Sequence, residues 1–482
     1  MPAPLLRPSA RSRADCVSRA QRRRPPGSIP PVPPPRDQGT PSAPRRERGW
    51  RCRRACCQAR PVSPSVPTGA PVEPVLRRAT RDDLPALRTF DSRAFSATWG
   101  DPDFAGFEGV FEPELFVLAL EPAAAGLAEA DALVGGAGAY SFTLTAPGGA
   151  RLPVPGVTWV GVALHQRRRG LLRRMLADLH AGFVAGGAPL AVLTASEATI
   201  YGRFGYGAAT TDRSVRVDRR RARLTPAAEA LAGPEVARHA TTAAVRGHLA
   251  AVHERWCAVT PGALTRSGAW WDWLLADTAD QRSGASELFT LVHPDGYATY
   301  RVSEGGTARV VDLVAATPAA HASLWRSLLA LDLVEEVLAS RGVPLGDPLP
   351  HLLADPRAVA TTAVQDGVWV RLLDVPAALA ARTYACEVDV VLEVVDDGGL
   401  GGVDASARVR LRGGPDGAEC TRTDAAADVR LGVAALGATY LGGTRLGPLA
   451  RAGLVESDDP AVLARLSAAL LGEREPQYGT SF

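Results

Sequence analysis

Hydrophobic and polar positions follow two different periods between residues 157 and 196. The stretch VTWVGVAL (157–164) alternates like a half-buried strand, and LAVLTAS (190–196) is a short apolar run typical of a buried strand. Between them, LLRRMLADLHAGF (171–183) repeats its apolar residues at the spacing of an amphipathic helix. A strand, a helix and a second strand in close succession predict a βαβ unit with parallel strands.

The same patterns predict elements along the rest of the chain. A helix is expected within RATRDDLPALRTF (78–90), where periodicity begins. Beyond residue 216 the pattern predicts helices at 243–257 and 323–338 and strands at 287–293, 297–302 and 308–316. The final part predicts strands at 368–375, 386–395 and 407–413 and a helix at 459–472. We therefore expect a mixed fold with α/β and α+β parts.

Residues 1–74 differ in composition from the rest of the chain. Residues 1–60 carry 15 arginines against three acidic residues, a net charge of +12, so the remainder carries −9 of the total of +3. We interpret 1–74 as a disordered Arg/Pro-rich tail or, as we favour, as the result of a mis-assigned start, with Val75 as the alternative. An acidic body suits a cationic substrate better than a nucleic acid, although the tail itself could bind RNA.

Composition excludes several kinds of chemistry. All 54 basic residues are arginine, and a chain without lysine cannot be a P-loop enzyme, a protein kinase or a Schiff-base enzyme. The seven cysteines and eight histidines show no zinc-ligand spacing, so no metal is expected. No apolar run reaches the roughly 18 residues of a membrane span, and no signal peptide opens the chain. We expect a cytoplasmic protein without membrane contact; export without a signal peptide stays open.

Three arginines stand where the helix of the βαβ unit should begin. Arg167, Arg168 and Arg169 precede Gly170, although the positive end of a helix dipole disfavours cations. A bound anion would remove this repulsion, because free N–H groups at a strand-to-helix turn and arginine side chains both bind phosphate oxygens. The alternative is a solvated basic patch. The residues alone leave the two interpretations about equally supported.

The turn and several longer strings carry a resemblance to a known family. Arg167 to Leu172 after a strand resembles the Q/R-x-x-G-x-G/A pyrophosphate signature of GCN5-related N-acetyltransferases (GNAT), with Leu172 in place of the small final residue. The strings VGVALHQRRRGLLR, ASEATIYGRFGYGAAT, HPDGYATYRV and DPLPHLLAD, with the terminal Phe482, resemble the Eis (enhanced intracellular survival) family of acetyltransferases. This resemblance covers nearly all of 75–482 and excludes the preceding tail.

The resemblance implies an organisation and an activity. It implies a catalytic GNAT domain at 75–215, a degenerate GNAT-like domain at 216–366 and a sterol-carrier-like α+β domain at 367–482. The central segment has no Arg-Arg-Gly turn, in keeping with a lost cofactor site. The family also implies acetyl-CoA as co-substrate, no metal, and a homohexamer built as a trimer of dimers. Its implied substrates are several amines of aminoglycoside antibiotics.

The resemblance also assigns roles to individual residues. Tyr201 is the implied general acid, and the α-carboxylate of Phe482 is the implied general base. Without the resemblance, a core aromatic is the preferred interpretation of Tyr201, and a frayed chain end is the alternative for Phe482. Backbone groups of the strand would bind the pantetheine arm and acetyl carbonyl, and the turn would wrap the diphosphate. The implied acetyl-CoA site comprises Val160, Gly161, Val162, Arg168, Arg169, Gly170, Leu171, Leu172, Arg173, Ser196 and Glu197.

The substrate cleft is less defined. Trp159 is expected to face it, and an acidic stretch at 101–115 is a candidate for gathering cationic sugars. The residue before Phe482 is the neutral Ser481, so the terminus brings one negative charge. Alternative acceptors are protein lysine and polyamines, which offer the same primary amine. The alternatives outside enzyme chemistry are a lipid- or sterol-binding protein and nucleic-acid binding by the tail.

Overall fold

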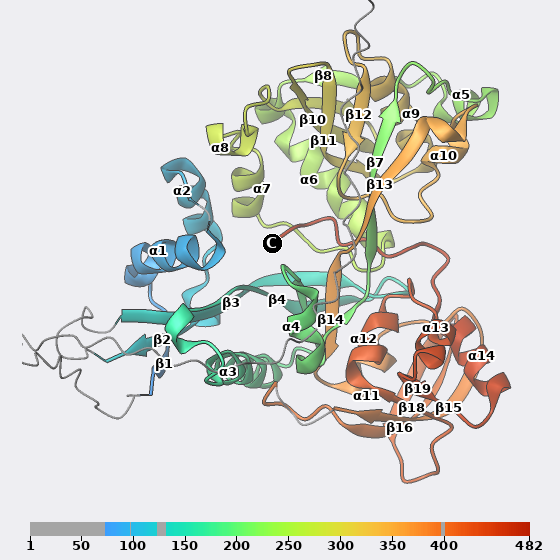
Figure 1. Ribbon diagram of the computed structural model, residues 1–482. Coiled ribbons are helices and arrows are strands. Elements are labelled where there is room, and N and C mark those ends of the chain that lie inside the picture. Colours follow the sequence, from blue (N-terminus) through green and yellow to red (C-terminus); the bar gives the residue numbers. More distant parts are fainter. Residues whose placement is uncertain (1–72, 97, 123–131, 397–400) are drawn as a thin grey trace, which may run out of the picture. The chain divides into compact units, whose positions relative to one another are not determined.

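The computed structural model describes residues 73–96, 98–122, 132–396 and 401–482. All of them belong to the compact unit at 69–482. The predicted tail at 1–74 therefore lies almost entirely outside the described residues. The described residues form three sheets, which appear in the order of the sequence except that β14 (Val368–Leu372) returns to the first (Figure 1).

The first sheet contains the predicted βαβ unit. β4 pairs in parallel with β5, and α3 connects them, which confirms that prediction. The sheet has the order β1-β2-β3-β4-β5-β14-β6. Its strands are β1 (Val75–Arg78), β2 (Val117–Glu121), β3 (Ala132–Thr145), β4 (Arg151–Val162), β5 (Leu190–Thr194), β6 (Gly207–Ala208) and β14 (Val368–Leu372). Its helices are α1 (Leu84–Phe95), α2 (Asp101–Val110), α3 (Leu171–Ala185) and α4 (Ala198–Tyr201).

The second sheet repeats this arrangement around a parallel pair, β11 and β12, joined by α9. Its order is β13-β7-β12-β11-β10-β9-β8. The strands are β7 (Thr211–Asp218), β8 (Arg238–Ala240), β9 (Phe289–His293), β10 (Gly296–Ser303), β11 (Thr307–Ala315), β12 (Glu336–Ala339) and β13 (Val359–Asp366). The helices are α5 (Pro226–Ala232), α6 (Thr242–Val259), α7 (Gly268–Leu274), α8 (Ala279–Arg282), α9 (Pro318–Leu329) and α10 (Leu349–Leu352).

The predicted helix at 323–338 is wrong in its second half. α9 ends at Leu329, and the last residues of the segment form β12 in the sheet. Leu333 adopts a left-handed φ of 61°, which a continuous right-handed helix does not allow. The apolar residues beyond this break alternate in burial, as the residues of a strand do.

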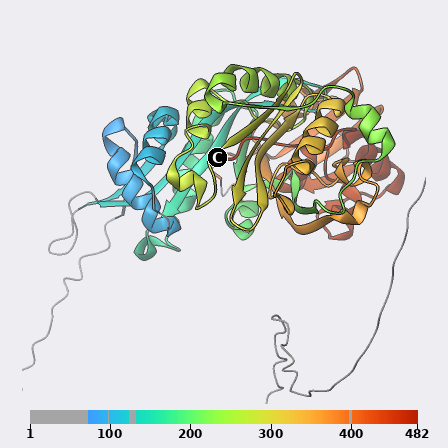
Figure 2. The same ribbon diagram turned by 90° about the horizontal axis from the view of Figure 1, so that it is seen from above.

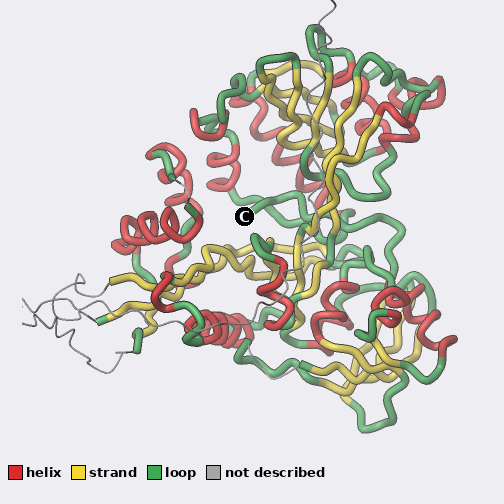
Figure 3. Tube along the Cα trace, viewed as in Figure 1, coloured by secondary structure: helices red, strands yellow, loops and turns green. Residues whose placement is uncertain are grey.

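The third sheet has the order β17-β16-β15-β18-β19 and carries helices over one face (Figures 1 and 3). Its strands are β15 (Val388–Val395), β16 (Ala407–Gly414), β17 (Gly417–Arg422), β18 (Val429–Gly432) and β19 (Val455–Glu456). Its helices are α11 (Val375–Ala380), α12 (Val433–Tyr440), α13 (Leu446–Arg451) and α14 (Pro460–Leu470).

Two strands connect the predicted domains. β7 begins before the predicted boundary at 215/216 and pairs with β13, whereas β14 follows the boundary at 366/367 and pairs with β5 in the first sheet. One hydrophobic core joins the first sheet to the third, since it includes Leu190 of β5, Val370 of β14 and Leu436 of α12. The last residues of the chain return to the first sheet (Figures 1 and 2).

Candidate active site

A cavity of about 810 Å³ opens where β4 separates from β5. β4 pairs with β5 only at Gly156 and Val157 among the described residues. Trp159 follows with a left-handed φ of 55°, next to a register shift between β3 and β4. Beyond this irregularity Val160, Gly161 and Val162 line the cavity. The separation leaves a strand edge to which an extended ligand can hydrogen-bond.

The arginine-rich turn forms one end of this cavity. Gly170 is the N-cap of α3 at φ 80°, and an added Cβ there meets nothing within 4 Å, so glycine serves the backbone conformation rather than space. Arg168 also has a left-handed φ, of 62°. Arg167, Arg168 and Arg173 are exposed and line the cavity. Three cations therefore surround the N-terminus of a fifteen-residue helix, in the arrangement expected of an anion site.

The opposite wall follows β5. Ser196 and Glu197 lie between that strand and α4, and Tyr201 ends α4. All three line the cavity with Leu171 and Leu172 of α3. Every residue predicted for the acetyl-CoA site therefore lies along one cavity except Arg169, whose side chain donates to Gln166 Oε1 at 3.1 Å. Sequence reasoning missed Phe95 on α1 and Arg203 after α4, and nothing in their local pattern sets them apart.

Tyr201 is buried although it lines the cavity. Its side chain is part of the core between α3 and β5. Burial, and to a lesser extent the negative charge of Glu197, raises the pKa of Tyr201 to about 12. Its hydroxyl is consequently protonated at neutral pH, as a proton donor must be. The two interpretations of this residue, core aromatic and acid, are compatible.

The C-terminus ends at the same edge of the first sheet. Thr194 Oγ1, at the end of β5, donates to the main-chain oxygen of Phe482 at 2.8 Å. The Phe482 ring packs on Phe142 with 5.0 Å between centroids, and a Cβ on Gly156 would come within 2.9 Å of it. Thr194 directly follows Leu193, the last β5 residue that pairs with β4, so the main-chain oxygen of Phe482 lies next to the point where the two strands separate. Phe482 itself is not among the residues that line the 810 Å³ cavity.

Trp159 and the acidic stretch at 101–115, which were predicted to lie near the substrate, make different kinds of contact. Trp159 stacks on Phe107, with 4.2 Å between ring centroids, and its Nε1 donates to the Tyr140 hydroxyl at 2.9 Å. Most carboxylates of the acidic stretch form an ion pair or a hydrogen bond, each with a different partner. Asp101 pairs with Arg88 at 2.8 Å, Asp103 accepts from Thr278 at 2.5 Å, Glu112 accepts from Ser141 Oγ at 2.6 Å, and Glu108 is exposed.

Glu112 lines a second cavity of about 480 Å³. Tyr140 and Phe142 line it too, and Phe142 is the residue that contacts the Phe482 ring. Ser267 and Trp270 complete the lining from the second domain, a contribution that sequence reasoning missed. Their distance in sequence from the first sheet explains why no local pattern indicates them.

Comparisons with known proteins fit this geometry. Residues 75–209 and 262–372 each match a family described as "Acetyltransferase (GNAT) domain", and residues 375–479 match "Sterol carrier protein domain". The chain is thus an N-acetyltransferase with two GNAT folds followed by a sterol-carrier-like domain, which confirms the expected fold class. GNAT enzymes use acetyl-CoA. Among the described residues, no helix is long and apolar enough to cross a membrane.

Individual relatives narrow the class. The chain is 41% identical over 410 residues to N-acetyltransferase Eis of Mycobacterium tuberculosis, covering 84% of this chain and 98% of the relative. It is 42% identical over 357 residues to an uncharacterized N-acetyltransferase of Streptomyces coelicolor, covering 70% and 83%. The crystal structure of Eis1 from Mycobacterium abscessus aligns with a TM-score of 0.72 at 34% identity, covering 85% and 100%. The chain belongs to the Eis family of N-acetyltransferases.

Proposed function

We propose that this enzyme transfers acetyl groups from acetyl-CoA to primary amines of cationic acceptors, at several positions of aminoglycosides. The observation that carries the proposal is the convergence of an anion-binding turn, a separated strand edge and a chain terminus at one end of the first sheet. The net charge of −9 outside residues 1–60 favours a cationic acceptor. We also propose the homohexamer that the family resemblance implies.

The 810 Å³ cavity lies within the size range of cofactor sites, and the chemistry of its lining suits acetyl-CoA. Arg168 and Arg173 would bind the diphosphate together with backbone N–H groups of α3. The strand from Val160 to Val162 would align the pantetheine arm and hold the thioester carbonyl, whose oxygen gains negative charge during attack. Ser196 and Glu197 would border the same arm from the β5 side.

The proposed reaction is direct attack. The acceptor nitrogen forms a bond to the acetyl carbon, the carbon–sulfur bond breaks, and the electron pair leaves with sulfur. The Phe482 carboxylate takes the proton from the attacking amine, and the Tyr201 hydroxyl gives a proton to the departing thiolate. Thr194 helps this chemistry by fixing the carboxylate at the end of β5. In each turnover the Phe482 carboxylate gains one proton and Tyr201 loses one, so the transfer of one proton between them through solvent restores both groups.

The test is acetyl transfer to kanamycin by the purified full chain. CoA release would be followed in solution, and the product would be weighed by mass spectrometry. We expect products with more than one acetyl group. CoA release at the rate of hydrolysis alone, from protein that binds acetyl-CoA, would reject aminoglycosides and favour the runner-up acceptors, protein lysine and polyamines. Sedimentation would measure the oligomeric state.

Deletion of Phe482 tests the proposed base. Removing it leaves the carboxylate on Ser481, one residue short of Thr194, so we expect kcat to fall by about 10²–10⁴-fold. Acetyl-CoA affinity should persist, because no residue of the 810 Å³ cavity changes. Phe482→Leu is the matched control, since it keeps both chain length and carboxylate. Full turnover by the folded deletion variant would contradict this role.

A further inference from the structure

The last six residues, which we call the terminal segment (477–482), are held along their length by other parts of the chain. Gln477 N donates to Pro261 O at 2.9 Å, and the Tyr478 carbonyl accepts from Leu264 N at 3.0 Å. Arg341 Nη1 donates to Ser481 Oγ at 2.9 Å. A chain end normally frays, so such a set of bonds calls for a reason.

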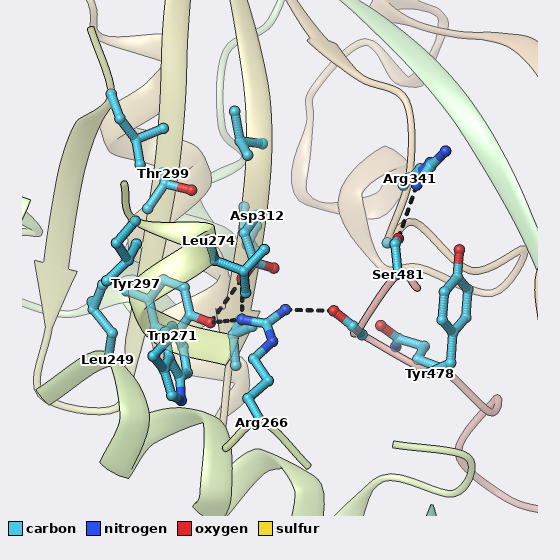
Figure 4. Close-up of a pocket in the computed structure, with 18 of the residues that line it drawn as sticks. Leu249, Arg266, Trp271, Leu274, Tyr297, Thr299, Asp312, Arg341, Tyr478 and Ser481 are labelled. Carbon is cyan, nitrogen blue, oxygen red and sulfur yellow. Dashed lines mark hydrogen bonds and ion pairs between the residues drawn. The ribbon is translucent and has the colours of Figure 1, made fainter. Parts of the chain in front are cut away.

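Arg266 makes the densest set of these contacts (Figure 4). Its Nη2 donates to the Gly479 carbonyl at 2.5 Å, and its Nε donates to Thr480 Oγ1 at 3.2 Å. The Thr480 hydroxyl in turn donates to the Leu264 carbonyl at 3.0 Å. One guanidinium thus hydrogen-bonds to two successive residues of the terminal segment. The planar guanidinium has several fixed N–H donors for such paired bonds, whereas a lysine ammonium lacks this geometry.

The second GNAT fold holds Arg266 in place. Its Nη1 donates to Asp312 Oδ2 on β11 at 2.7 Å and to the Tyr297 hydroxyl on β10 at 3.0 Å. The guanidinium also lies 4.9 Å from the centroid of Trp271 on α7. The Arg266 side chain is only 3% exposed, which fixes its orientation. Figure 4 shows these groups converging on Arg266 from the sheet side, with the terminal segment on the other side.

The Arg266–Thr480 hydrogen bond lies two residues before the chain end. Thr480 is bound by Arg266, Phe482 is bound by Thr194, and only Ser481 separates them. Without the Arg266 contacts, the last residues would keep the bonds of Thr480 to Leu264, Ser481 to Arg341 and Phe482 to Thr194, together with the Phe482 ring contact. The backbone that delivers the carboxylate would lose its only charged, fully buried anchor among these contacts and would move more freely. Displacement of a reacting group by about 1 Å can cost about a hundredfold in rate.

We propose that Arg266 is a positioning residue that fixes the terminal carboxylate in the active site from the second GNAT fold. The second GNAT fold, which has no counterpart of the Arg167–Gly170 turn, thereby contributes to catalysis by holding the proposed base of the first GNAT fold. The inference rests on the proposed role of Phe482 as base. It adds a function for the central domain, namely to set the position of a group that another domain uses.

The experiment measures the freedom of the terminal segment separately from activity. Carboxypeptidase A would be added to the full chain, and loss of Phe482 would be followed by intact-mass spectrometry. We expect release from Arg266→Met to be about tenfold faster or more, because the segment opens more often. Thr480→Val should accelerate release while keeping the Arg266–Asp312 pair, so it covers the case in which Arg266→Met does not fold.

Arg255→Met is the matched control. Arg255 lies in the same domain and pairs with Asp295 at 2.7 Å, and its side chain is 51% exposed. Release from this control at the rate of the unchanged protein is expected. Release at that same rate from folded Arg266→Met and from Thr480→Val would overturn the proposal.

Acetyl transfer to kanamycin separates the two proposals. With Phe482 as base, kcat of Arg266→Met should fall by about 10–100-fold while the KM for acetyl-CoA stays unchanged. Arg266→Lys should recover part of kcat. Faster release of Phe482 with undiminished kcat would overturn the catalytic part of this inference while leaving the anchoring contact established, whereas full turnover by the Phe482 deletion variant would contradict the base itself. Slow release with low kcat would overturn the anchoring instead.

Discussion

At the scale of single residues, Tyr201 combines burial with a proton that it keeps at neutral pH. Its pKa is raised to about 12, so the protonated form persists until the pH approaches that value and is lost only above it. We expect Tyr201→Phe to lower kcat by about 10²–10⁴-fold, because the departing thiolate loses its proton donor. Steady-state kinetics with kanamycin would measure kcat, and calorimetry would show acetyl-CoA binding within about twofold of the unchanged protein.

Tyr206→Phe is the control for this prediction. Tyr206 is also fully buried and lies in the same segment, but its hydroxyl bonds to His180 and it does not line the 810 Å³ cavity. We expect this change to alter stability more than kcat. Equal losses of kcat in the two variants would argue against a specific proton donor at Tyr201.

Single residues were the hardest to predict from the sequence. Tyr201 and Phe482 were singled out by the family resemblance, because an aromatic residue near glycines reads locally as core. The left-handed conformations of Trp159 and Arg168 have no sequence signal, since non-glycine residues rarely adopt them. Arg266 is one arginine in a chain that uses arginine for every basic residue, and its partners come from distant strands. Only the folded arrangement reveals them.

At the scale of elements, the turn between β4 and α3 should govern acetyl-CoA binding. We expect Arg168→Ala combined with Arg173→Ala to raise the KM for acetyl-CoA by about tenfold or more, because two charge-assisted contacts to the diphosphate are lost. Kinetics at saturating acetyl-CoA should show kcat nearly unchanged. The effect should shrink at high salt, where the charges of the unchanged turn are screened.

Arg174→Ala provides the control on the same helix. Arg174 pairs with Glu73 at 2.9 Å and does not line the cavity. Its removal should leave the KM for acetyl-CoA unchanged. If Arg174→Ala raised this KM as much as the double change, the turn would act through general charge rather than as a specific anion site.

Elements with a strong period were predictable, and their partners were not. The βαβ unit around α3 was correctly predicted because both strands and the helix are strongly patterned and follow one another closely in the sequence. The helix expected at 323–338 failed because a mixed apolar run conceals the break at Leu333. The insertion of β14 between β5 and β6 depends on pairing with strands more than 150 residues away, as Val370 with Val192, and no local pattern encodes this.

At the scale of the whole molecule, the first sheet and the C-terminal domain are joined by polar groups as well as by their common core. His180 on α3 donates from Nδ1 to the Gly401 carbonyl at 2.9 Å and accepts from the Tyr206 hydroxyl at 2.8 Å. Arg371 on β14 pairs with Asp396 at 2.7 Å, and the Arg371 side chain has no exposure. The two His180 hydrogen bonds require a neutral imidazole, because the Gly401 carbonyl can only accept and the Tyr206 hydroxyl donates to the other ring nitrogen.

Acid should therefore loosen this junction. Burial first, and the charge of Arg371 second, lower the pKa of His180 to about 4, whereas in the unfolded chain it is near 6.5. The neutral imidazole stabilises the fold fully above pH 6.5, and this contribution is lost as the pH falls from 6.5 toward 4, by about 2 kcal/mol between pH 7.5 and 5. Urea unfolding of the full chain and of His180→Gln at both values would measure it. The stability gap between the two proteins should narrow in acid. Parallel losses would show that His180 is not the group that titrates.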